Sequence, residues 1–136
     1  MFFSELNFLT IAIAGVSNMI LGYVWYMALF AKPWMKLVNL KEEKVDEQAS
    51  PGMTYITSFV LALVSATVFQ SVFFTYNPAS MMEAVSLGFF VWLGFIFCVM
   101  TNQSLFVKKP FKLILIDSGF YLASIIMWSL LFLYVG

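Results

Sequence analysis

The sequence predicts an all-α integral membrane protein in which four helices form one bundle. Hydrophobic residues make up 62% of the chain, charged residues make up only 10%, and the charges are concentrated in two segments. A soluble domain of this size carries roughly 25% charged residues and has too little interior for so many apolar side chains. Apart from Glu5, Glu83 and Asp117, every charged residue lies in 32–47 or 108–112.

The charged segments divide the chain into four apolar stretches. Each stretch exceeds the roughly 20 residues that an α-helix needs to cross a hydrocarbon core of about 30 Å. We therefore expect one membrane domain, residues 1–136, with a short interfacial and cytoplasmic helical loop between the first two spans. The expected spans are residues 6–31, 53–76, 82–107 and 111–135, and the expected cytoplasmic loops are residues 32–52 and 108–110.

The lysines indicate how the spans are oriented. All seven basic residues lie in the first loop or around the third turn, and none lies in the N-terminal segment or the 77–81 connection. The positive-inside rule places both lysine-bearing connections in the cytoplasm. Because four spans put the two termini on one side, both termini are expected outside.

Small and polar residues recur at helical spacing within the spans and predict close helix packing. In lipid, small side chains let helix backbones approach each other, and polar side chains form hydrogen bonds between helices. The second span shows the pattern most regularly, with such residues at every fourth position from Ser58 to Gln70. The residues expected in helix contacts are Asn18, Gly22, Ala62, Ala66 and Gly88.

The first loop is expected to have two parts. Residues 33–40 mix Trp34, Leu37 and other apolar side chains with Lys36, which is typical of an amphipathic segment on a membrane surface. Residues 41–48 are highly charged and rich in helix formers. The charged part is interpreted either as a solvated helix face or as a docking site for a partner protein.

Polar side chains of all four spans are expected at one depth in the inner leaflet. At a helical rise of about 1.5 Å per residue, Tyr26, Ser58, Asn102 and Asp117 each lie about 8–9 Å from the cytoplasmic end of their span. Tyr121 shares a helix face with Asp117 because the two are four residues apart. The candidate ligand-binding or ion-binding residues are Tyr26, Ser58, Asn102, Gln103, Asp117 and Tyr121.

The hypothesis of a ligand-binding or ion-binding site depends mainly on Asp117. An ionised carboxylate at the bilayer centre costs roughly 2.5–3.5 kcal/mol on insertion scales, so Asp117 is expected to face the bundle, meet a partner or be protonated. It is either a structural hydrogen-bond centre or a group that binds a proton, a cation or another ligand. One carboxylate without a histidine or a second acid is too little for general acid–base hydrolysis or a metal site.

Other function classes lack the residues they need. The chain has no histidine, and Cys98 is its one cysteine. It contains no glycine-rich phosphate loop, no catalytic triad and no pair of haem ligands. We therefore expect no cofactor and no metal, and catalytic residues are not assigned. Nucleic acid is not an expected partner because the seven basic residues lie at a membrane surface.

Three blocks of sequence carry a family resemblance. The first joins Leu-Gly-x-x-Trp-Tyr at 21–26 to Leu-Phe-x-Lys-x-Trp at 29–34, the second is Trp-Leu-Gly-Phe at 92–95, and the third runs from Asn102 to Tyr121. With these blocks the chain resembles a family of small bacterial four-helix membrane proteins known as domain of unknown function 1761. The resemblance implies the same topology in a bacterial cytoplasmic (inner) membrane, and it implies no activity. Ala31 and Asp117 stand where that family is expected to have glycine and asparagine.

Three functions are compatible with these observations. The favoured one is an oligomeric bundle whose polar layer binds or passes a small solute or ion. Because one protomer leaves little room for a pathway, transport would favour a homo-oligomer, a dimer or larger. The alternative is a structural or accessory membrane protein that docks a partner through residues 41–48. A lipid-modifying enzyme is the least favoured, since no nucleophile and base are paired in the sequence.

Overall fold

The computed structural model describes residues 6–38 and 51–135, which are helical and contain no strand. This confirms the predicted all-α fold with four membrane helices. The charged segment 41–48 lies outside the described residues. The elements are α1 (Phe8–Tyr23), η1 (Val24–Leu29), α2 (Ala31–Val38), α3 (Pro51–Tyr76), α4 (Met81–Trp92), η2 (Leu93–Phe97), α5 (Cys98–Val107) and α6 (Phe111–Tyr134), where η denotes a π-helix.

Four helical spans are long and apolar enough to cross a membrane, and the chain is therefore a multi-pass membrane protein. The first span joins α1 to η1, and the third joins α4, η2 and α5 into one continuous rod. The spans are Phe8–Leu29, Gly52–Tyr76, Met81–Val107 and Phe111–Tyr134.

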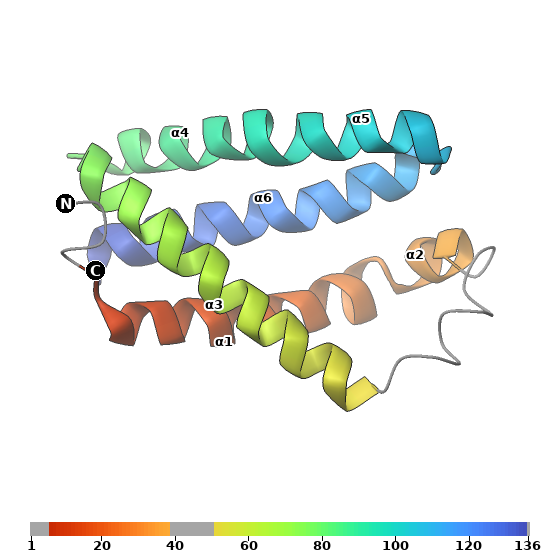
Figure 1. Ribbon diagram of the computed structural model, residues 1–136, viewed down its shortest axis with the longest axis horizontal. Coiled ribbons are helices and arrows are strands. Elements are labelled where there is room, and N and C mark those ends of the chain that lie inside the picture. Colours follow the sequence, from red (N-terminus) through yellow and green to blue (C-terminus); the bar gives the residue numbers. More distant parts are fainter. Residues whose placement is uncertain (1–5, 39–50, 136) are drawn as a thin grey trace.

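The bundle has two ends that differ in composition (Figure 1). At the terminal end lie the start of α1, the connection between α3 and α4 at residues 77–80, and the end of α6. At the loop end lie α2, the start of α3, and the turn 108–110 that connects α5 to α6. The described lysines all belong to this loop end.

Helix α6 is the centre of the bundle. It is the most buried of the four spans, and it contacts α1, α2, α3, α4 and α5. Its closest approach to α4 occurs at Gly88, where an added Cβ would lie 2.6 Å from Ser129 Oγ. Because real Cβ contacts are essentially never that short, only glycine fits here unless the Ser129 side chain or one of the helices shifts.

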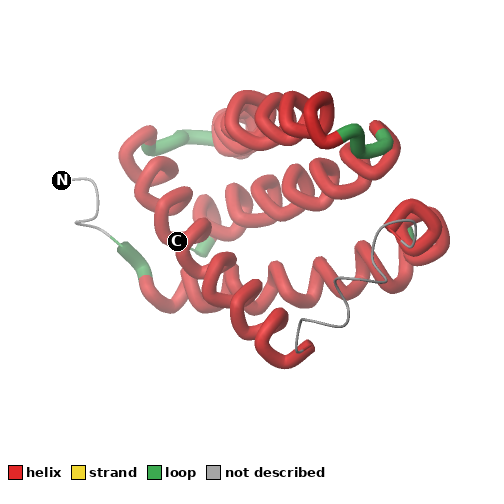
Figure 2. Tube along the Cα trace, turned by 45° about the vertical axis from the view of Figure 1, so that its right-hand side comes forward, coloured by secondary structure: helices red, strands yellow, loops and turns green. Residues whose placement is uncertain are grey.

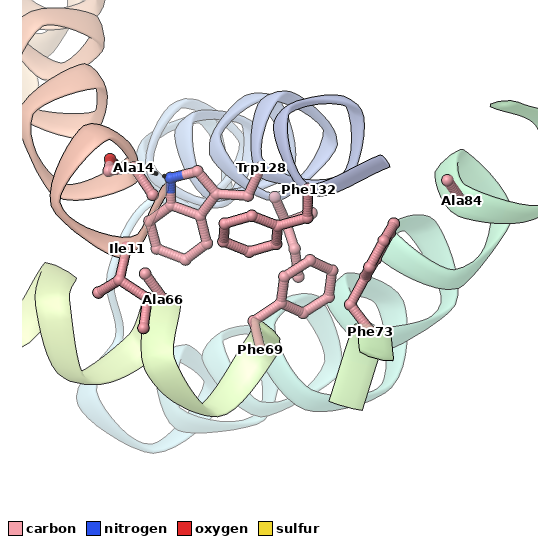
Figure 3. Close-up of a cluster of buried hydrophobic side chains, with 9 residues drawn as sticks. Ile11, Ala14, Ala66, Phe69, Phe73, Ala84, Trp128 and Phe132 are labelled. Carbon is pink, nitrogen blue, oxygen red and sulfur yellow. Dashed lines mark hydrogen bonds between the residues drawn. The ribbon is translucent and has the colours of Figure 1, made fainter. Parts of the chain in front are cut away.

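The aromatic core lies at the terminal end, where all four spans meet (Figure 3). Phe69 and Phe73 of α3 pack against Phe132 of α6, with ring centroids 6.1 and 6.0 Å apart. Trp128 packs beside them, and its Nε1 donates a hydrogen bond to the backbone oxygen of Ala14 at 3.1 Å. This bond gives the buried indole N–H a partner and joins α6 to α1.

A buried glutamine connects α1 to α3 at the same end. Gln70 is 0% exposed, and its Oε1 accepts a hydrogen bond from the backbone N–H of Asn7 at 2.8 Å. Its Nε2 donates to Thr10 Oγ1 at 2.7 Å and to the backbone oxygen of Asn7 at 3.3 Å. Asn7 also caps α1, because its side chain accepts from the N–H groups of Leu9 and Thr10.

Helix α3 crosses the bundle obliquely and separates from the other spans toward the loop end (Figure 2). Its second half supplies Ala66, Phe69 and Phe73 to the core, whereas residues 52–58 at its start are exposed. The loop end therefore has a looser arrangement of helices than the terminal end.

Both described turns contain a residue in the left-handed region. Asn77 follows α3 with a φ of 55°, and Lys108 follows α5 with a φ of 59°. At the start of α4, Ser80 Oγ accepts from the N–H of Glu83 at 3.3 Å, and the Glu83 carboxylate accepts from the N–H of Ala79. The Ser80–Glu83 pair therefore caps α4 in the way that a capping box does.

Candidate functional site

The candidate site is centred on a hydrogen bond between the first and last spans. The hydroxyl of Tyr26 in η1 donates to Asp117 Oδ1 in α6 at 2.7 Å. Both side chains are half-buried in the monomer. Since a carboxylate in an apolar layer needs a partner, the phenol stabilises Asp117 at this position.

Two indoles hold the turn of α6 on which Asp117 lies. Trp25 Nε1 donates to the backbone oxygen of Ile116 at 3.0 Å, and Trp92 Nε1 donates to the backbone oxygen of Ser118 at 2.7 Å. These are the carbonyl groups immediately before and after Asp117 in the chain. Because they are bound from two different spans, the direction in which the carboxylate projects is fixed.

Both π-helical segments adjoin these indoles. Trp25 and Tyr26 belong to η1, and Trp92 is the residue immediately before η2. A π-helical segment changes the direction of the side chains that follow it, and such segments occur frequently at functional sites. Two of them therefore meet α6 at the turn that carries Asp117. The amino-acid pattern contains no signal from which they could have been found.

Aromatic rings of α2 and α6 pack around the Tyr26 ring, whose hydroxyl binds the carboxylate. The Tyr26 ring lies 5.1 Å from the ring of Trp34 in α2 and 5.5 Å from that of Phe120 in α6, measured between centroids. Phe120 lies 5.3 Å from Tyr121. Gly119 makes room for Trp25, because an added Cβ would lie 3.2 Å from that indole. We call Tyr26, Trp34, Phe120 and Tyr121 the aromatic cluster.

The structure brings three of the sequence-predicted binding residues together. Tyr121 lies one helical turn beyond Asp117 in α6, and its ring packs against Phe120, which also contacts the Tyr26 ring, so it lies beside the Tyr26–Asp117 pair. Ser58, Asn102 and Gln103 lie elsewhere. All three are exposed on the described monomer, and no hydrogen bond among its described residues connects them to Asp117.

These outward positions have a simple geometrical cause. Ser58 belongs to the half of α3 that separates from the bundle, while Asn102 and Gln103 are exposed next to Ser104, which is buried. Their depth along each helix follows from the helical rise. Their rotation about the helix axis does not, because it depends on how the helices pack.

The residues predicted in helix contacts lie in several places along the bundle. Ala62 and Ala66 are buried in α3, and Gly88 lies against α6. Gly22 faces the Phe120 ring, with an added Cβ at 3.6 Å. Asn18 is half-buried, and its side-chain oxygen is enclosed with no hydrogen-bond partner among the described residues.

Within residues 6–38 and 51–135, no three His, Cys, Asp or Glu side chains are grouped so that they could hold a metal ion. The oxygen atoms at the site are those of Asp117 and the two phenols. This arrangement suits electrostatic and hydrogen-bonded recognition of a small ligand better than metal coordination, which requires several protein ligands.

The comparisons with known proteins bear on the family alone. No curated protein and no solved structure matches this chain. A family match begins in α1 and ends near the close of α6, so it covers the whole bundle together with the Tyr26–Asp117 pair. Residues 9–133 match the family described as "Protein of unknown function (DUF1761)", and the chain therefore belongs to that family.

Proposed function

We propose that this protein binds a small solute or ion in the inner leaflet of a bacterial cytoplasmic membrane, at a site formed by Asp117, Tyr26 and Tyr121. The proposal depends on the hydrogen bonding of the Asp117 carboxylate, because only one of its two oxygen atoms has a partner among the described residues. Asp117 Oδ1 is hydrogen-bonded to Tyr26, while Oδ2 has no hydrogen bond to a described residue and is not fully enclosed. An acceptor of this kind in an apolar layer favours a ligand that supplies a donor or a positive charge.

The position of the lysines supports the orientation. Lys32 and Lys36 of α2 lie at the same end of the bundle as Lys108, Lys109 and Lys112. With this end in the cytoplasm, as the positive-inside rule requires, the termini are outside and the site opens toward the inner leaflet.

We further propose that the protein is a homo-oligomer. Ser58, Asn102 and Gln103 are exposed on the monomer although they belong to membrane spans. Polar side chains in contact with lipid chains lose the hydrogen bonds they make in water, and contact with a second copy would restore them. An oligomer would also provide the additional helices that passage of a solute requires.

The alternative is a structural or accessory role. It is favoured by the fact that Tyr26, Trp25 and Trp92 all form bonds to α6 at one turn, which would hold the spans together without any ligand. Docking through residues 41–48 remains part of this alternative. A lipid-modifying reaction has less support, since the site pairs a carboxylate with phenols and offers no nucleophile activated by a base.

The test is native mass spectrometry of gently purified protein, comparing the wild type with Asp117→Asn. The asparagine oxygen can still accept from Tyr26, so the variant removes the charge and keeps the contact. We expect a bound low-mass species in the wild type and its loss in Asp117→Asn. Glu83→Gln is the matched control because it removes a carboxylate at the terminal end, in the first turn of α4.

The structural alternative predicts a different result. In that case Tyr26→Phe lowers the melting temperature, and wild type and Asp117→Asn carry the same bound species or none. That outcome would contradict the binding proposal.

A further inference from the structure

We propose that the ligand of this site is an organic cation, an amine or a quaternary ammonium group, held between Asp117 and the aromatic cluster. The inference rests on the proposed function and names the chemical class of its ligand. Two features of the site lead to it: a carboxylate oxygen that has no hydrogen bond to a described residue, and rings of α2 and α6 packed against the Tyr26 ring of η1, whose hydroxyl binds that carboxylate.

The carboxylate favours a positive charge. Asp117 Oδ2 forms no hydrogen bond to the described residues, and it is not fully enclosed. The ammonium group of Lys109 is near enough to act on Asp117 electrostatically, but no hydrogen bond joins these two described side chains. Lys109 is exposed at the loop end, so a cation that binds Asp117 Oδ2 displaces no hydrogen-bonded partner among the described residues.

The rings favour an organic cation over a metal ion. The faces of Trp and Tyr rings attract ammonium groups, most strongly where water is excluded. Trp34 is half-buried and Tyr121 is 44% exposed, so both offer ring surface that the packing has not covered. Ca²⁺ requires six to eight oxygen ligands and Mg²⁺ six, whereas this site offers one carboxylate and two phenols. A weakly hydrated ammonium group matches what the site supplies.

The first experiment compares choline with its neutral carbon analogue, in which carbon replaces the quaternary nitrogen. Binding to detergent-purified protein is measured by tryptophan fluorescence, with Trp34→Phe identifying the part of the signal that comes from Trp34. We expect choline to bind and its analogue to bind about tenfold more weakly or not at all, since the two differ in charge and hardly in size. Equal binding of the two compounds, or binding of neither, would overturn the proposal.

Variants then locate the bound cation. Asp117→Asn should weaken choline binding by about tenfold or more, and Glu83→Gln should leave it unchanged. Trp34→Leu should weaken it by about three- to tenfold through loss of one cation–π contact. If Asp117→Asn does not fold, Trp34→Leu and the neutral analogue still decide the question. Choline binding that is insensitive to both variants would place the cation elsewhere and overturn the assignment.

A final arm separates a free solute from a lipid headgroup. The same titration is made in nanodiscs of phosphatidylcholine and in nanodiscs of phosphatidylglycerol. If the site holds a lipid headgroup, added choline must compete with phosphatidylcholine and will bind more weakly in those nanodiscs than in phosphatidylglycerol. If the site holds a free solute, choline will bind equally well in both. Either result supports an organic cation. If native mass spectrometry instead finds a neutral or anionic species that depends on Asp117, the organic cation is excluded while the proposed binding function stands.

Discussion

The two ends of the bundle are held together in different ways. At the terminal end all four spans converge on an aromatic core, and Gln70 joins α1 to α3 from a fully buried position. At the loop end α3 has separated, and η1 is joined to α6 by Tyr26 and Trp25. The terminal end is therefore closed by packing, whereas the loop end positions its polar groups around the turn of α6 that carries Asp117 and leaves part of them accessible.

This difference follows from the solvent. Lipid chains are as apolar as leucine, so membrane helices associate through close packing and hydrogen bonds. The terminal end has both in abundance, which makes it the stable part of the bundle. The loop end satisfies its carboxylate and its indoles but leaves ring surface and one carboxylate oxygen available. A binding site is expected at the less stable end, because ligand-binding segments come from regions of low local stability.

The largest effect is expected from a cavity in the core. Phe132→Ala removes a ring that is 2% exposed and contacts Phe69 and Phe73. We expect the free energy of unfolding in detergent to fall by about 3 kcal/mol, because neighbouring side chains refill such a cavity only in part. Phe106→Ala at the loop end, where the ring is 81% exposed, should change it by less than about 0.5 kcal/mol. Equal losses would contradict the assignment of the stable core to the terminal end.

The second-largest effect is expected from loss of the buried hydrogen bonds of Gln70. Gln70→Leu keeps the side-chain volume and removes the hydrogen bonds that the amide makes to Thr10 and to the backbone of Asn7. We expect a loss of about 1–2 kcal/mol, measured by denaturant unfolding. The same substitution at exposed Gln103 is the matched control, and it should be neutral in a monomer. A stabilising Gln70→Leu would show that the buried network is not a source of stability at this end.

Much of this fold could be predicted from the sequence, and the features that could not be predicted depend on tertiary packing. Span length and apolar content predict the four helices because a bilayer requires both, and helical rise predicts that Tyr26 and Asp117 lie at one depth. The tilt of α3, which turns Ser58 outward, depends on its packing against α1 and α6. The π-helical segments and the indole bonds to backbone carbonyls also depend on tertiary contacts, and no residue pattern marks them.

A smaller effect distinguishes the inner and outer faces of the third span. Gly88→Ala introduces a Cβ that would lie 2.6 Å from Ser129 Oγ and 3.4 Å from the backbone oxygen of Ile125. We expect a loss of about 0.5–1.5 kcal/mol, since Ser129 must leave its rotamer or the helices must separate. Gly94→Ala is the control, because nothing lies within 4 Å of its added Cβ. It should be neutral or raise stability by up to about 1 kcal/mol through helix propensity. A loss of stability in Gly94→Ala comparable to that in Gly88→Ala would contradict the closeness of α4 to α6.

The smallest effect compares the left-handed residues in the turns at the two ends. Lys108 at the loop end has a φ of 59°, a conformation that places its Cβ close to a backbone carbonyl, whereas glycine adopts it freely. Lys108→Gly should therefore raise the melting temperature, with a gain in the free energy of unfolding of about 0.5–1 kcal/mol. Asn77→Gly at the terminal end should gain only a few tenths of a kcal/mol, because asparagine tolerates this conformation better than lysine. A larger gain at Asn77 than at Lys108 would mean that the strain lies in the tightly packed end, which would reverse the comparison of the two ends.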